Sequence, residues 1–240
     1  MVLATILLAV SADLSDCPAR YSHPSDGWLT VKWAHYRLGD CVKLNDKTAC
    51  SYITDNNKTR STLMYNYSHQ SKGAKPNITL LAALVRNMQC PHPPSDSLVM
   101  HFRLGDVIEL SKTPVATMIS DGGSSHPPHG AAFAHAIKSL NEIYDDMRSV
   151  NLTSVSIVGG THLAAYSGRR APKSFAYFHC IVEGLRARNV TVHTRLDMNP
   201  DQSFCYASSA RYFGVGVGGF SRLIGQVVRA LGNVRIGRIF

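Results

Sequence analysis

The chain has 240 residues, of which 45% are hydrophobic and 17% charged, a composition that excludes wholesale disorder and allows one large domain or two small ones. No apolar run reaches the roughly 20 residues of a membrane-spanning helix, which excludes a polytopic membrane protein. The formal net charge is +9, and residues 168–240 concentrate it, with eleven Lys and Arg against three acidic residues. This basic stretch favours an anionic partner: a phosphate, a nucleotide, a nucleic acid or an acidic glycan.

Residues 1–12 predict a signal peptide, because a short apolar run, Val2 to Val10, leads into the small-residue pattern Val10-Ser11-Ala12. The alternatives are a truncated start and a plain buried segment. If a membrane anchor is missing upstream, or if the predicted signal peptide stays uncleaved, the protein would contact a membrane through its N-terminal end.

Two further features favour the secretory pathway, either the ER or Golgi lumen or the extracellular space. Asn-x-Ser/Thr sequons occur at Asn57, Asn66, Asn77, Asn151 and Asn189. The six cysteines are even in number and form no CxxC pair, which fits disulfides in an oxidising compartment. The alternative is a set of buried free thiols in a cytosolic chain.

Residues 13–95 predict a small, incomplete N-terminal lobe, with a helix over 79–88 and a proline-rich linker over 90–94. Residues 96–240 alternate short β-rich runs with longer helical patterns, which predicts an α/β fold with a Rossmann-like parallel sheet and helices on both faces. The expected strands are 97–102, 154–158, 190–193, 212–217 and 233–236. The expected helices are 131–150, 173–188 and 220–231, and residues 110–130 predict a long loop.

The first candidate site follows the first strand of this sheet, where His101-Phe102-Arg103-Leu104-Gly105-Asp106 stands. Ligands of open α/β sheets bind at the carboxyl ends of the strands, and an arginine there offers a planar fork for phosphate. Gly105 permits a sharp exit, and Asp106 either orients the arginine or caps the turn. The alternative is a surface ion pair between Arg103 and Asp106, with His101 facing the core.

The second candidate site is a glycine-rich stretch, Gly214 to Ser221, at a strand-to-helix junction. Gly218 and Gly219 would let a ligand approach the backbone, and the amides that open the next helix form an anion site, with Arg222 beside it. The alternative is that these glycines serve only close packing of strand and helix. Because both stretches follow strands of one parallel sheet, a single phosphate is expected to touch both.

A loop between these stretches supplies Asp197 and Asp201, either of which would accept hydrogen bonds from a base or a ribose. Asp201 is also a candidate N-cap for a short helical segment over 202–210. His162 follows the second strand of the sheet and either faces substrate or merely ends that strand.

These residues resemble the fucosyltransferase-like branch of the GT-B glycosyltransferases, which includes the α1,2-, α1,6- and protein O-fucosyltransferases. The resemblance covers roughly residues 97–236. It rests on His-x-Arg-x-Gly-Asp at 101–106, on Asp-x-x-Phe-Cys at 201–205 and on Gly-Gly-Phe-Ser at 218–221. It implies that Arg103 and Ser221 grip the diphosphate of a GDP-sugar from two sides.

The resemblance implies an inverting transfer of a sugar, with fucose favoured, from a GDP-sugar to a glycan or glycoprotein acceptor. Neither a cofactor nor a metal is expected, since the chain has no Asp-x-Asp dyad for a divalent ion. The general base is Asp106, Asp121 or His162, which the sequence does not rank. The expected catalytic and donor-binding residues together are His101, Arg103, Gly105, Asp106, His162, Asp197, Asp201, Gly218, Gly219, Phe220, Ser221 and Arg222.

Two departures from the family pattern support an alternative, a binder of nucleotides or glycans that has lost transfer. Many members carry two adjacent arginines where this chain has Arg103-Leu104. The N-terminal lobe over 13–95, which the resemblance places on the acceptor side, is short for the full acceptor lobe of a GT-B enzyme. Nucleic acid is not expected as a partner, because the basic stretch lacks interleaved aromatic residues and the predicted address is lumenal.

Overall fold

A computed structural model describes residues 78–87, 91–122, 137–161, 171–196, 200–216 and 218–237. The predicted signal peptide and most of the predicted N-terminal lobe lie outside these residues. The strands are β1 Ser97–Leu104, β2 Ser154–Thr161, β3 Thr191–Arg195, β4 Tyr212–Gly214 and β5 Val234–Ile236. The helices are α3 Ile78–Asn87, α4 Asp106–Glu109, α5 Val115–Asp121, α6 Leu140–Arg148, α7 Pro172–Arg186, α8 Pro200–Ser208 and α9 Gly219–Ala230.

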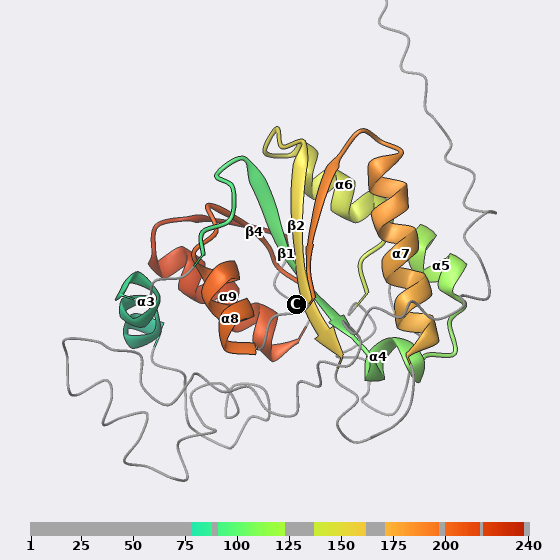
Figure 1. Cartoon of the computed structure of the whole chain (residues 1–240), viewed down its shortest axis with the longest axis horizontal. Helices are drawn as coiled ribbons and strands as arrows, with labels where there is room; N and C mark the ends of the chain where they lie inside the picture. Colours follow the sequence, from blue (N-terminus) through green and yellow to red (C-terminus); the bar gives the residue numbers. More distant parts are fainter. Residues whose placement is uncertain are drawn as a thin grey trace, which may run out of the picture.

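The five strands form one parallel sheet in the order β3-β2-β1-β4-β5, with β1 at its centre (Figure 1). The chain builds outward from β1 to β3 and then returns to the other side of β1 with β4. The predicted α/β class with a Rossmann-like parallel sheet is therefore confirmed. The reversal of strand order between β1 and β4 is the place where such folds bind ligands.

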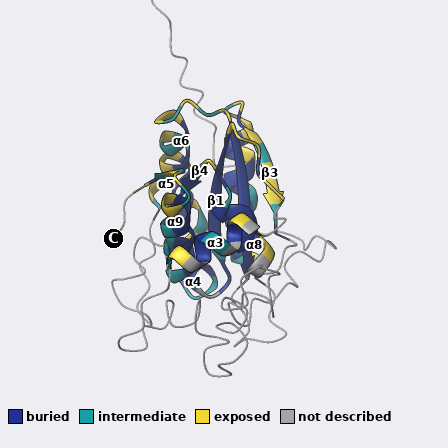
Figure 2. Ribbon diagram, turned by 90° about the vertical axis from the view of Figure 1, so that its left-hand side faces the viewer, coloured by how far each residue is buried: buried dark blue, intermediate teal, exposed yellow. Residues whose placement is uncertain are grey.

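Helices cover both faces of the sheet (Figures 1 and 2). The strand β1 supplies side chains to both layers. Leu98, Met100 and alternate residues beyond them are buried in a cluster with residues of α4, α5, α6 and α7. Val99 lies in a second cluster with residues of α3, α8 and α9. This alternation follows from the two-residue period of a strand and decides on which face each site residue stands.

The helix predicted over 220–231 is confirmed as α9, which buries an apolar stripe. Phe220, Leu223, Ile224, Val227 and Val228 are all buried against the sheet and α3. Each such side chain contributes about 1.5–3 kcal/mol of transfer free energy when it leaves water. Burial of this stripe therefore holds α9 against the sheet and fixes its N-terminus at the carboxyl edge.

Two of the predicted segments are wrong. Residues 110–130 were expected to be loop, but α5 occupies 115–121, because Met118 and Ile119 are buried one helical turn after Val115. The helix expected over 131–150 begins only at Leu140, where Ser139 and Glu142 form a capping box.

The remaining expected strands and helices are present, with ends shifted by up to three residues. Within the described residues, no helix is both long enough and apolar enough to cross a lipid bilayer.

Candidate functional site

The candidate site lies at the carboxyl edge of the sheet, where β1 and β4 are neighbours. Both motifs singled out in the sequence reach this edge, one from the end of β1 and the other from the turn between β4 and α9. The topology brings them together because every strand is parallel and every following element starts at the same edge. The two motifs are therefore neighbours at one edge of the sheet, whereas contact of a single phosphate with both stays a prediction.

Arg103 extends from β1 toward the start of α9. A Cβ placed on Gly218 would lie 3.7 Å from Arg103 Nη1, so the guanidinium stands directly beside this glycine. Gly218 has φ 107° and ψ 157°, a conformation that is essentially restricted to glycine. Arg103 is half-buried, and its neighbour in register on β2 is Gly160, which adds no side chain next to it. A permanent positive charge therefore faces the positive end of the α9 dipole.

This juxtaposition is suited to an anion. A guanidinium and a helix N-terminus both attract a phosphate that lies between them. The first amides of a helix have no acceptor within the helix itself, and in α9 these amides belong to Gly219, Phe220 and Ser221.

His101 and Phe220 pack together at the base of this site, and a contact of either with a donor stays a prediction. Their ring centroids lie 4.9 Å apart at an edge-to-face angle of 66°, and both side chains are buried. Phe220 also contacts Phe204 of α8, with centroids 6.2 Å apart. The alternative in which His101 faces the core thus describes its position, and the aromatic contact ties the end of β1 to the start of α9.

Ser221 holds the turn that precedes α9. Its side chain is fully buried, and its Oγ accepts a hydrogen bond from the amide of Gly216 at 2.7 Å. One lone pair of the Ser221 hydroxyl is thus already used within the chain. The contact of Ser221 with a diphosphate stays a prediction. A Cβ on Gly216 would lie 2.8 Å from the carbonyl oxygen of His101, so this glycine serves close packing, as the alternative for the glycine-rich stretch proposed.

The turn after β1 is held by α7, through a contact that no local sequence pattern indicates. Gly105, with φ 95°, donates its amide to Ser174 Oγ at 2.9 Å. The amide of Ser174 in turn donates to Glu109 Oε1 at 2.7 Å. Lys173 donates to the carbonyl of Ser111, and burial lowers its pKa while Glu109 partly restores it. This network fixes the backbone that immediately follows Arg103.

A small pocket opens beside the end of β1, on the side of α4 and α7. Its lining includes Arg103, Ile108, Lys138, Tyr177 and Gly216. Tyr177 donates its hydroxyl to the carbonyl of Lys138 at 2.6 Å, and Lys138 forms an ion pair with Asp146. These contacts set one wall of the pocket and leave Arg103 as the charged group shared by the pocket and the α9 turn.

The other sequence-predicted residues are less closely defined. Asp106 begins α4 and Asp201 lies in the first turn of α8, so both backbones are at the carboxyl edge, although their side chains are outside what the structure describes. The prediction of Asp201 as an N-cap is wrong, since α8 begins one residue earlier at Pro200, a residue favoured in the first turn.

Arg222 is half-buried in the first turn of α9, and Asp121 is exposed at the end of α5. His162 and Asp197 lie outside the described residues.

Sequence comparison of the chain with known proteins finds no match. No family model matches the chain. No curated protein matches it either.

Among solved structures, the chain is similar to two crystal structures of POFUT1, a protein O-fucosyltransferase, in complex with GDP. For the high-resolution dataset the identity is 14% and the TM-score 0.36, with 72% of this chain and 51% of that chain covered. For the third crystal form the identity is 15% and the TM-score 0.35, with 72% and 50% covered. The chain thus spans about half the length of the solved proteins that it matches.

Proposed function

We propose that the chain binds the diphosphate of a nucleotide sugar, with GDP as the nucleotide, between Arg103 and the start of α9. The observation that carries this proposal is the 3.7 Å approach of Arg103 Nη1 to the Cβ position of Gly218 at the switch point of the sheet. It puts a guanidinium and a helix N-terminus on one spot, and their backbones are fixed by contacts that involve no ligand. The choice of GDP rests on the resemblance of the motifs.

We further propose that the bound donor is a GDP-sugar, with fucose favoured, and that the sugar passes to a hydroxyl of a glycan or glycoprotein acceptor with inversion. The acceptor oxygen forms a bond to the anomeric carbon while the bond from that carbon to the diphosphate breaks. Arg103 and the α9 amides stabilise the negative charge of the departing GDP, which is where such a reaction gains most. The acceptor proton passes to a base, for which Asp106, Asp121 and His162 remain the candidates.

A second function, binding without transfer, is favoured by the position of Leu104. Its side chain is fully buried in the apolar cluster on the α4–α7 face, opposite to the face on which Arg103 meets Gly218. Arg103 is therefore the single charged group that the end of β1 contributes to the site, whereas many members of the resembled family carry two adjacent arginines. This smaller positive charge fits a binder that has lost transfer.

The deciding experiment is thermal unfolding of the full chain with GDP, with UDP, ADP and CMP as controls. At a hundredfold excess over its dissociation constant, GDP is expected to stabilise the protein by about 2.7 kcal/mol. Loss of the charge-assisted hydrogen bonds in Arg103→Ala weakens binding by about a hundredfold, so that the same GDP concentration gives about 0.4 kcal/mol.

The matched control is Arg229→Ala, which removes an exposed arginine from the far end of α9. It is expected to keep the full GDP effect. Equal loss in the two variants, or no stabilisation by any nucleotide, would contradict the proposed site. Stabilisation by GDP without release of GDP from GDP-sugars in the presence of mixed glycan acceptors would establish the second function.

A further inference from the structure

Three helices that end at the amino edge of the sheet, α6, α7 and α9, close with the same hydrogen-bond pattern. After α6, the amide of Asn151 donates to the carbonyl of Arg148 at 3.1 Å, and the amide of Leu152 to that of Met147 at 3.0 Å. After α7, Asn189 donates to Arg186 at 2.9 Å and Val190 to Leu185 at 3.1 Å; after α9, Gly232 donates to Arg229 and Asn233 to Val228, both at 3.0 Å. These are Schellman motifs, in which one residue must take the left-handed conformation.

The left-handed residue differs among the three ends. It is Gly232 after α9, with φ 84°, but Asn151 and Asn189 after α6 and α7, with φ 58° and 59°. Glycine takes this conformation without cost, and asparagine is the side chain that tolerates it best. Backbone geometry alone therefore permits asparagine at these two ends but does not require it.

At both asparagine ends the surrounding residues form an exposed Asn-x-Thr sequon. The middle residues, Leu152 and Val190, pack into the core cluster that holds Met147 and Leu185, as the Schellman motif prefers. The asparagines and the threonines that follow, Thr153 and Thr191, are exposed. The fold thus turns the apolar middle residue inward and keeps the two residues that define the sequon at the surface.

The two sequons are neighbours at the edge opposite to Arg103. The amide of Thr191 donates to the carbonyl of Thr153 at 2.9 Å, just before β2 and β3 begin their register at Ser154 and Thr191. Each of the two described cysteines, Cys180 and Cys205, is buried and takes part in a disulfide bond, as is usual in an oxidising compartment. Bulky groups at this edge would leave the carboxyl edge open.

We propose that Asn151 and Asn189 are both N-glycosylated, as a pair on the amino edge of the sheet. Nδ2 of each asparagine forms a bond to the anomeric carbon of an oligosaccharide carried on a lipid diphosphate. The bond from that carbon to the diphosphate oxygen breaks, the lipid diphosphate leaves with the electron pair, and the amide loses one proton. This proposal does not rest on the proposed function, since it involves neither Arg103 nor a nucleotide.

The test is expression of the full chain in mammalian cells behind an added cleavable signal, followed by enzymatic removal of N-glycans in heavy-oxygen water. Release converts each glycosylated asparagine to an aspartate that carries the heavy isotope, which peptide mass spectrometry locates. Asn151 and Asn189 are expected to carry this label. Asn141, which is exposed on α6 and belongs to no sequon, is expected to remain unlabelled and controls for spontaneous deamidation.

Two kinds of variant separate the glycan from the helix end. Asn151→Gly and Asn189→Gly keep a residue that accepts positive φ, and Thr153→Ala and Thr191→Ala keep the asparagine but destroy the sequon. Each is expected to lose one glycan by gel mobility, whereas Thr153→Ser and Thr191→Ser retain it. The double glycine variant is expected to keep the wild-type Tm shift with GDP.

Absence of label at Asn151 or Asn189 in both the secreted and the cell-associated protein would overturn the proposal for that residue. Retention of the mobility shift in Thr153→Ala or Thr191→Ala would overturn it as well. Label at Asn57, Asn66 or Asn77 in the same sample shows that the chain met the glycosylation machinery, so an unlabelled helix end would then be a property of the fold.

Discussion

Among single residues, Tyr177 shows how the wall of the candidate site is secured. Its side chain is buried, and its hydroxyl donates to the carbonyl of Lys138 across the gap between α7 and the start of α6. Burial raises the pKa of Tyr177 well above its ordinary value of 10.0, and the carboxylate of Glu142 raises it further. The folded protein therefore holds this proton at pH values where the unfolded chain has released it.

This difference predicts a loss of stability in alkali. Because the folded pKa is raised, the contribution of Tyr177 is fully present below about pH 10 and declines as the pH rises further. The free energy of unfolding is expected to fall by about 1.4 kcal/mol between pH 8 and pH 11 on account of this one group. In Tyr177→Phe that component disappears, although the variant loses about 1 kcal/mol at neutral pH with the hydrogen bond. Urea unfolding at several pH values measures both, and parallel curves for the two proteins would contradict the assignment.

At the level of elements, strands and helices with a clear period were predicted from the sequence, and so was the meeting of the two motifs. The stripe of α9 and the run of β1 are buried in the way their patterns indicate. The meeting followed from topology, because parallel strands place their carboxyl ends at one edge. The short α5 was missed because its flanking prolines and glycines outweighed one turn of apolar spacing.

The inner details of the site were beyond prediction. Ser174 supports Gly105 from 69 residues away in the sequence, and no local pattern announces such a contact. The burial of Phe220 and Ser221 depends on how closely α9 packs on β1, which the glycines allow but do not specify.

The start of α6 offers a prediction about capping. Ser139 Oγ accepts the amide of Glu142 at 3.1 Å, and Glu142 Oε2 accepts the amide of Ser139 at 2.7 Å. Ser139→Ala is expected to lower the free energy of unfolding by about 1 kcal/mol, because the amide of Glu142 at the helix start loses its side-chain acceptor. The comparison is Ser149→Ala at the exposed end of the same helix, with an expected change within about 0.5 kcal/mol. Chemical denaturation distinguishes the two, and equal effects would argue against the capping box.

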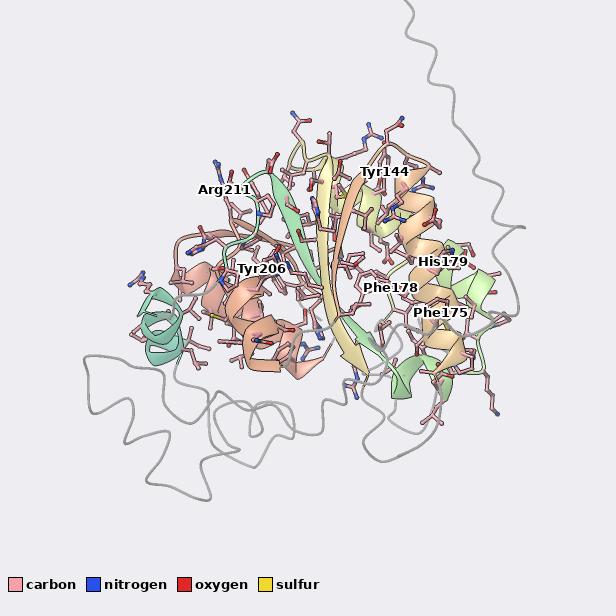
Figure 3. The ribbon with its side chains drawn as sticks, viewed as in Figure 1. Tyr144, Phe175, Phe178, His179, Tyr206 and Arg211 are labelled. Carbon is pink, nitrogen blue, oxygen red and sulfur yellow. The ribbon has the colours of Figure 1, made fainter. Side chains whose placement is uncertain are left out.

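For the molecule as a whole, the positive charge is divided between the two edges of the sheet. Arginines occupy the last turns of α3, α6, α7 and α9, where they oppose the negative ends of the helix dipoles. Arg211 and Tyr144 mark this amino edge in Figure 3, and the guanidinium of Arg188 lies 5.1 Å from the Tyr144 ring centroid. Two arginines of the basic C-terminal stretch, Arg186 and Arg229, therefore serve helix ends, and Arg103 comes from outside that stretch.

This division predicts that ligand binding does not follow net charge. A triple variant, Arg148→Gln, Arg186→Gln and Arg229→Gln, removes three charges from helix ends. It is expected to lose about 1–3 kcal/mol of stability in total and to keep the GDP-induced stabilisation of the wild type. Arg103→Gln removes one charge and is expected to lose most of that stabilisation. A GDP effect that declines in proportion to the number of charges removed would contradict this view.

The central position of β1 limits the conformational freedom that Arg103 loses when a ligand binds. Both faces of this strand are covered and both of its sides are hydrogen-bonded to neighbours, so it belongs to the part of the molecule that opens least often. Arg103 is the last residue but one of β1. It lies between Gly105, whose amide donates to Ser174 of α7, and Gly218, which precedes the first residue of α9. A side chain whose root is already immobile loses little freedom when an anion arrives. The phosphate affinity proposed for this edge would thereby be prepared during folding, and little binding free energy would go into ordering the chain at the moment of binding.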